Sequence, residues 1–148
     1  MELLFDLPPW ATTRDRGWAT YAAPDHSLRF VVAPLVERPL ADVRQLLSHA
    51  LPAGARVDVL AESTGRARVG WAMTTATVRI VDEAGEVERR YVAIYQVLWM
   101  VGAIMVMGRA VELERQRDLI ERVLPSGRPR LRSVEPACVA EWFELEAA

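Results

Sequence analysis

Cysteine and histidine are scarce in this chain of 148 residues: there is one cysteine, Cys138, and there are two histidines, His26 and His49. A single cysteine excludes a disulfide within the chain, so a reducing compartment fits better than an oxidising one. A zinc site needs three or four convergent ligands, and neither histidine has a cysteine or an acidic residue at ligand spacing. We therefore expect no metal site, and we interpret Cys138 as a small packing residue.

Catalytic and phosphate-binding motifs are also missing. No serine lies in a G-x-S-x-G setting, and the eight glycines are scattered without forming G-x-G-x-x-G. The acidic residues between 82 and 88 gather at a predicted hairpin tip, whereas catalytic carboxylates need a cleft. The net charge of -2 gives no electrostatic footprint for nucleic acid. We expect a protein that is not an enzyme, with no catalytic residue, no cofactor and no nucleic-acid partner.

Export signals are not found at the N-terminus. The sequence MELLFDLPPW has an acid at position 2, no basic region, no small-residue cleavage site and no lipobox cysteine. A cytoplasmic location is therefore the expectation. The composition is 51% hydrophobic and 26% charged, which is typical of one folded domain that buries about two-thirds of its surface. We expect a single domain over residues 1–148.

The most apolar segment is 91–107, YVAIYQVLWMVGAIMVM, with Arg90 and Arg109 at its two sides. It is either a membrane span or the centre of a sheet. A spanning helix needs about 20 apolar residues, and this segment reaches only the lower limit and includes Gln96 and Gly102. Its β-branched and aromatic residues are typical of strands, and the basic residues at both ends set no orientation. The sequence favours two strands with a bend at Gly102, and no stable membrane insertion.

The remaining elements follow from periodicity and turn signals. Apolar residues at helical spacing predict helices over 40–51 and 109–124, which end at Pro52 and Pro125. Residues 10–21 are polar and are predicted to be irregular. Alternating or β-branched runs predict strands over 2–7, 28–34, 56–61, 67–81, 86–100 and 103–107, a hairpin at 82–85 and a final strand or docking segment over 130–145. This order defines an α+β domain, an antiparallel sheet meander flanked by two main helices.

The strand at 91–100 has two apolar faces. Tyr91, Ala93, Tyr95, Val97 and Trp99 are predicted on one face, and Val92, Ile94, Leu98 and Met100 on the other. The two helices can cover one face. The second face must also be covered, because large exposed apolar patches are rare in soluble monomers. A homodimer or an apolar ligand would cover it.

Methionine and tryptophan side chains can line an adaptable apolar groove, although core packing is the alternative for each of them. The candidate partner-binding residues are Trp71, Met73, Tyr95, Trp99, Met105 and Met107. A basic row, Arg128, Arg130 and Arg132, could bind phosphate or carboxylate if it lies on a strand. A solvated edge strand protected by charge is the favoured interpretation of that row.

The element order resembles the Mog1/PsbP-like α+β fold, which includes DcrB-like proteins. The matching residues are Phe5, Leu7, Pro8 and Trp10 in the first strand and the segment after it, Tyr21, Pro24 and Asp25 in an aromatic-Pro-Asp turn before the strand at 28–32, the tyrosine-containing strand at 91–99, and the late helix at 109–124. The resemblance covers most of the chain and rests on element order, not on a specific motif. It implies a non-catalytic binding module.

Within that family the chain resembles the Eag-type chaperones of type VI secretion. Those proteins are cytoplasmic dimers that shield the transmembrane helices of effectors before export. The resemblance implies a chaperone whose partner is an apolar segment of a secreted effector. A structural or oligomerisation domain of a larger bacterial assembly, with no client, is the alternative. A small enzyme or ligand-binding barrel would need a polar cluster in its pocket, for which Tyr95 and Gln96 are the inward candidates.

Overall fold

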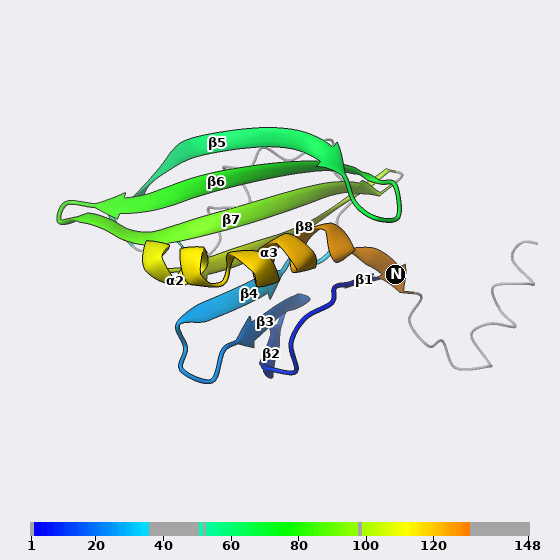
Figure 1. Ribbon diagram of the computed structural model, residues 1–148, viewed down its shortest axis with the longest axis horizontal. Helices are drawn as coiled ribbons and strands as arrows, with labels where there is room; N and C mark the ends of the chain where they lie inside the picture. The colour runs from blue at the N-terminus through cyan, green and yellow to red at the C-terminus, as the bar shows by residue number, and fades with distance from the viewer. Residues whose placement is uncertain (1, 36–50, 52, 98, 131–148) are drawn as a thin grey trace, which may run out of the picture.

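The structure is a computed structural model that describes residues 2–35, 51, 53–97 and 99–130. In this part of the chain, seven strands form an antiparallel sheet in the order β2-β3-β4-β8-β7-β6-β5, and β1 pairs separately with β9 (Figure 1). The strands are β1 (Glu2–Leu4), β2 (Ala11–Asp15), β3 (Trp18–Ala22), β4 (Leu28–Val32), β5 (Arg56–Arg66), β6 (Ala72–Asp82), β7 (Gly85–Val97), β8 (Met100–Gly108) and β9 (Arg128–Arg130). The helices are α2 (Ala110–Arg115), α3 (Arg117–Val123) and the 3-10 turn η1 (Leu124–Ser126).

The apolar segment 91–107 forms the two central strands of the sheet, β7 and β8, and is not one continuous helix. The two strands pair antiparallel, from Val97 opposite Met100 to Arg89 opposite Gly108. None of the helices in the described residues is both long enough and apolar enough to cross a membrane. This segment therefore belongs to the sheet and is not a spanning helix, as its β-branched composition predicted.

The predicted bend at Gly102 is wrong. Strand β7 ends at Val97 and β8 begins at Met100, so the chain reverses before Gly102. Gly102 lies inside β8 opposite Tyr95, where a β-carbon would collide with the Leu3 side chain. The glycine therefore lets β1 approach the sheet. The early reversal also changes the predicted face of Met100, which packs against the first core with Tyr95 and not with Val92 and Ile94.

Several other boundaries differ from the prediction. The first strand ends at Leu4 and not at residue 7, and the strand predicted over 56–61 extends to Arg66. Residues 10–21 contain the β2–β3 hairpin, which turns at Arg16 and Gly17 with φ of 50° and 84°, the two positive values of a type I′ turn. The predicted strand 67–81 begins only at Ala72, because Gly70 (φ 94°) belongs to the turn that follows β5. The predicted helix 109–124 is divided at Gln116 into α2 and α3. Predictions for 40–50 and for the tail beyond 130 lie outside the described residues.

Two cores lie on opposite faces of the sheet. The first core packs the sheet against α2, α3 and the N-terminal segment, and it includes Phe30, Tyr95 and Ile104. The second includes Val78, Val92 and Met105. The predicted hairpin at 82–85 is confirmed by the pairing of Asp82 with Gly85, and the α+β fold is confirmed with it. Figure 1 shows α2 and α3 on one face of the sheet.

The sequence predicted that a second copy or a ligand must cover the second face. This prediction is wrong, because that face is already buried within one chain. Within one chain, Val92 is 0% exposed, Met105 2% and Met107 4%. These side chains already lie in a packed core, so an open apolar face over β7 and β8 does not exist for a partner to cover. The second face therefore no longer supports a homodimer, and the homodimer stays a prediction.

Candidate functional site

The six predicted partner-binding residues divide into two groups. Tyr95 is fully buried in the first core, and Met105 and Met107 are buried in the second core, on the opposite face of the sheet. No single surface holds these three side chains, and none of them can contact a partner while the cores stay closed. Trp71 and Met73 are half-buried, and Trp99 is 65% exposed.

The three accessible residues lie at the same end of the sheet. Met73 is paired with Tyr95, two residues before the end of β7. Trp71 precedes β6 by one residue, and Trp99 lies between β7 and β8, two residues after Val97. Val69, in the turn between β5 and β6, is also exposed. We call Val69, Trp71 and Trp99 the apolar tip.

Next to the tip, a groove of about 410 Å³ lies between α3 and the outer strands β5 and β6. Its floor consists of small side chains: Ala61 and Ser63 from β5, and Thr75 and Thr77 from β6. Ser63 pairs with Thr75 and Ala61 with Thr77, so the four side chains share one face of the sheet. We call this hollow the α3 groove.

Apolar side chains form the walls of the α3 groove. Met73 and Tyr91 rise from the sheet, and Ile120 and Leu124 come from α3 and η1. All four also belong to the first core or pack against it, so the groove is an open continuation of that core. Met73 follows Trp71 by two residues and packs against the same core, and it therefore links the groove to the apolar tip.

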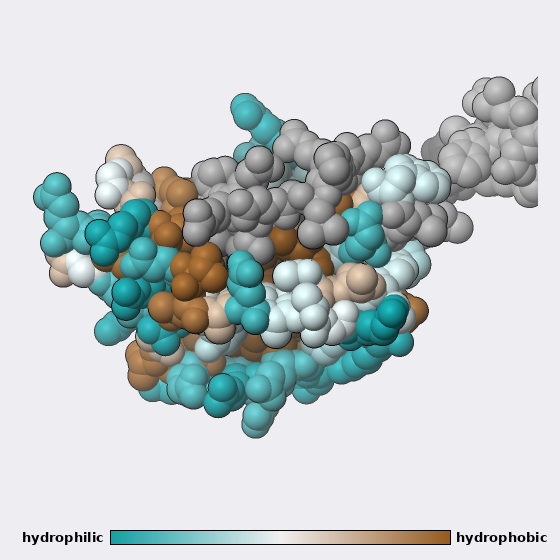
Figure 2. Space-filling model, turned by 90° about the horizontal axis from the view of Figure 1, so that it is seen from above, coloured by the Kyte–Doolittle hydropathy of each residue, from teal (hydrophilic) through white to brown (hydrophobic). Residues whose placement is uncertain are grey.

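The α3 groove carries little net charge, since its charged lining residues are Glu62, Arg117 and Glu121. At its rim, Arg117 forms ion pairs with Glu114 (3.4 Å) and Glu121 (3.5 Å). On its floor, the hydroxyls of Ser63 and Thr75 are hydrogen-bonded to each other at 2.6 Å. Figure 2, seen from above, shows side chains of intermediate hydropathy (white) beside hydrophilic ones (teal). The groove therefore favours apolar side chains over an ion.

One end of the α3 groove is fixed by hydrogen bonds between distant segments. The Arg68 backbone N–H donates to the Pro125 carbonyl (3.0 Å), and its guanidinium donates to the Arg122 carbonyl (3.2 Å) and to Asp6 (3.4 Å). Asp6 also accepts a hydrogen bond from Arg128 at 2.8 Å. These contacts join the β5–β6 turn, the end of α3 and the segment after β1, so the groove is preformed.

The acidic residues at the hairpin tip have structural partners. Asp82 accepts a hydrogen bond from the Ala84 backbone N–H (2.7 Å), and Glu86 pairs with Arg89 (2.9 Å). Within the described residues, no three His, Cys, Asp or Glu side chains converge as metal ligands. His26 lies in a turn with φ of 59°, and His49 and Cys138 lie outside the described residues. Hydrogen bonds from Ser27 lower the pKa of the exposed Asp25.

Sequence reasoning found Met73 but missed the rest of the groove. The signal was present, since small residues recur on one side of the alternation in 56–66 and 72–82. Placing α3 beside that side required the folded structure. The predicted basic row is divided: Arg128 pairs with Asp6, Arg130 lines a second cavity described below, and Arg132 lies outside the described residues.

No known protein family and no curated protein matches the sequence. The chain is similar in structure to cyanobacterial PsbP (CyanoP) from Synechocystis sp. PCC 6803, with a TM-score of 0.59 and 8% identity over 87% of this chain and 93% of that one. It is also similar to PA94 from Pseudomonas aeruginosa, a protein of unknown function called a putative regulator, with a TM-score of 0.57 and 13% identity over 88% and 99% of the two chains. At these identities the likeness shows the fold alone. The predicted Mog1/PsbP-like fold is thereby confirmed.

Proposed function

We propose that this protein is a non-catalytic binding module that receives an apolar segment of another protein, of the transmembrane-helix type, in the α3 groove. The observation that carries the proposal is a preformed, near-neutral groove whose apolar wall continues into an exposed apolar tip. Apolar area removed from water contributes roughly 25 cal/mol per Å². The same surface would otherwise remain hydrated.

The floor of the groove suits a helix in particular. Ala61, Ser63 and Thr75 carry short side chains, and small residues let a helix backbone approach closely. The hydroxyls of Ser63 and Thr75, now bonded to each other, can also turn to polar groups of a client. Met73 at the wall is unbranched and adapts to side chains of different shape.

The apolar tip supplies the anchors that protein interfaces favour. Tryptophan is enriched among the residues that dominate binding energy, and Trp99 is 65% exposed in one chain. Trp71 and Met73 connect it to the groove. We therefore place the client along the groove with one end over the tip.

The resemblance to Eag-type chaperones supports a secreted effector as the client, and a cytoplasmic location and a homodimer belong to the same proposal. Dimerisation by extending the sheet at β5 is disfavoured. The β5 strand carries charged side chains such as Arg56 and Glu62 and a register shift between Val59 and Ala61, features that protect an edge from pairing. A homodimer would instead use the apolar tip.

Calorimetric titration with a helical leucine-alanine peptide, kept soluble by terminal lysines, tests the proposal. We expect Met73→Asp to weaken binding by about tenfold or more, because it places a charge on the groove wall where an interface anchor is expected. The matched control is Val87→Asp, since Val87 is an exposed apolar residue at the opposite end of β7. The affinity of the Val87→Asp variant for the peptide should equal that of the wild type.

Two results would count against the chaperone. If the folded Met73→Asp variant, checked by circular dichroism, binds the peptide as the wild type does, the groove is not the site. If light scattering shows that the wild type forms a closed dimer and titration shows that it does not bind the peptide, the protein is a structural or oligomerisation domain and not a chaperone.

A further inference from the structure

A second cavity, of about 510 Å³, lies between the N-terminal segment and the strands β2, β3 and β4. Leu3, Phe5 and Leu7 line one side of it, and Val32 and Leu35 line another. It shares no lining residue with the α3 groove. Its size falls in the range of small-molecule sites, about 300–1,000 Å³. Its lining combines these apolar side chains with the charged residues Arg14, Asp15, Arg16 and Arg130.

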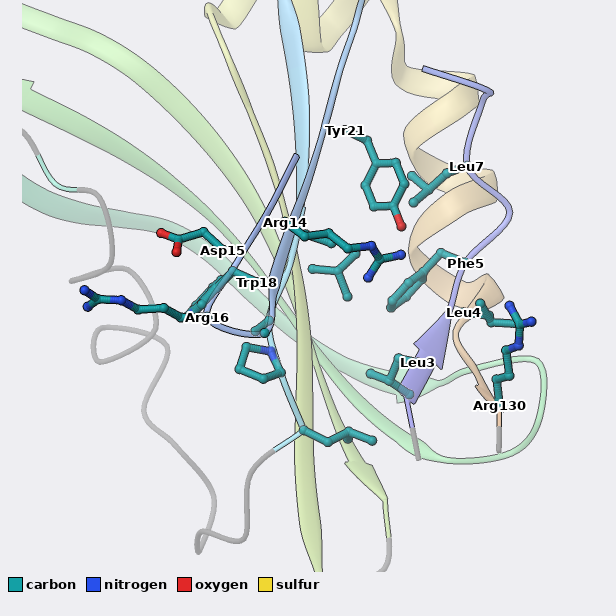
Figure 3. Close-up of a pocket in the computed structure, with 16 residues that line it drawn as sticks. Leu3, Leu4, Phe5, Leu7, Arg14, Asp15, Arg16, Trp18, Tyr21 and Arg130 are labelled. Atoms are coloured by element: carbon teal, nitrogen blue, oxygen red, sulfur yellow. The ribbon is translucent and has the colours of Figure 1, made fainter. Parts of the chain in front are cut away.

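Arg14 is the charged group directed into this cavity. Thr12 pairs with Tyr21 and Arg14 with Ala19, so Arg14 and Tyr21 lie on the same face of the β2–β3 hairpin. In Figure 3, the Arg14 guanidinium and the Tyr21 hydroxyl both point to the space that Phe5 and Leu7 border. A guanidinium and a hydroxyl thus face an apolar slot.

The charge at this cavity is uncompensated. Within the described residues, Arg14, Arg16 and Arg130 make no hydrogen bond or ion pair through their side chains, whereas Arg79, Arg89 and Arg128 are all paired. Asp15 is the single acid among the described lining residues, and Figure 3 shows its carboxylate and the Arg16 guanidinium both turned away from Phe5 and Leu7, which leaves Arg14 as the charge beside these two side chains. The cavity is therefore locally cationic on a chain of net charge -2.

We propose that this cavity binds an aliphatic monocarboxylate. The planar guanidinium of Arg14 matches a carboxylate with two parallel hydrogen bonds, and the Tyr21 hydroxyl can donate a third. The alkyl chain lies against Leu3, Phe5 and Leu7, which removes it from water. This inference goes beyond the proposed function, because it assigns a small ligand to a cavity separate from the protein-binding groove.

The experiment is calorimetric titration of the full chain with decanoate below its micelle concentration, at about neutral pH. We expect saturable one-to-one binding. Decanol, which lacks the charge, and decyltrimethylammonium, which reverses it, should bind at least about tenfold more weakly, because each loses the charge-assisted hydrogen bonds. Acetate should bind weakly as well, because it lacks the apolar chain.

Three variants locate the site. Arg14→Gln should weaken decanoate binding by about tenfold or more. Arg109→Gln is the matched control, since Arg109 also has an unpaired side chain within the described residues but lies outside this cavity. Met73→Asp should leave decanoate binding unchanged, which separates this site from the groove. The proposal is overturned if decanol or decyltrimethylammonium binds as tightly as decanoate. It is also overturned if Arg14→Gln binds decanoate with wild-type affinity, or if Met73→Asp loses decanoate binding.

Discussion

Tyr95 carries a buried hydroxyl that has no hydrogen-bond partner in the described part of the chain. Its ring packs against Phe5, with centroids 5.7 Å apart. An unsatisfied buried polar group costs about 1–3 kcal/mol. We predict that Tyr95→Phe raises the free energy of unfolding by about 1 kcal/mol, measured by urea denaturation. A lower free energy in the variant would mean that the hydroxyl is satisfied in solution.

The same residue gives a pH dependence of stability. Burial raises the pKa of Tyr95 above its ordinary value of about 10, because the charged phenolate is disfavoured in the core. The native state then holds the proton that the unfolded state releases. The stability is therefore fully present below about pH 10 and falls as the pH rises beyond it. Tyr95→Phe should remove this part of the alkaline loss.

Gly102 shows how a residue can be recognised as special while its role is misread. A glycine within an apolar run indicates a bend, a bulge or a close approach of another segment. The sequence interpretation chose the bend, whereas Leu3 lies where a Gly102 β-carbon would be. Leu3 is far away in sequence, so the close approach could not be recognised from the neighbours of Gly102.

At the scale of the element, strand β7 carries two ion pairs between its own residues, and they differ in burial. Arg90 is 1% exposed and donates to Glu88 at 2.5 Å, whereas the pair of Arg89 with Glu86 lies near the surface. We predict that Glu88→Gln lowers the free energy of unfolding by about 2 kcal/mol, because it removes a counter-charge from a buried guanidinium. Glu86→Gln, the control, should change it by less than about 1 kcal/mol. Equal effects in urea denaturation would refute the distinction.

The elements that the sequence revealed are those with at least one buried face or a turn motif. The hairpin at 82–85 and the strands 28–32 and 85–97 have such signals. The β2 strand was missed because all five of its residues are exposed, which leaves no alternation. The reversal between β7 and β8 was missed because apolar residues, including Trp99, stand where polar turn residues are usual.

At the scale of the molecule, the site could be predicted only in part. Composition pointed to methionine and aromatic residues, and Met73, Trp71 and Trp99 do lie at one end of the sheet. Met105 and Met107 have the same composition but are buried in the second core. Periodicity predicts which side chains share one face of a strand. It does not predict which other element packs on that face, and this packing decides whether a residue is buried or exposed.

The methionines Met73, Met100, Met105 and Met107 provide probes of both cores and of the α3 groove in a single spectrum. Methyl NMR of methionine-labelled protein, titrated with the apolar helical peptide, tests the central claim most directly. We predict that the Met73 methyl resonance shifts with saturation while the buried Met105 and Met107 resonances stay in place. Shifts at Met105 and Met107 with an unchanged Met73, or no shift at any methionine, would contradict binding in the α3 groove.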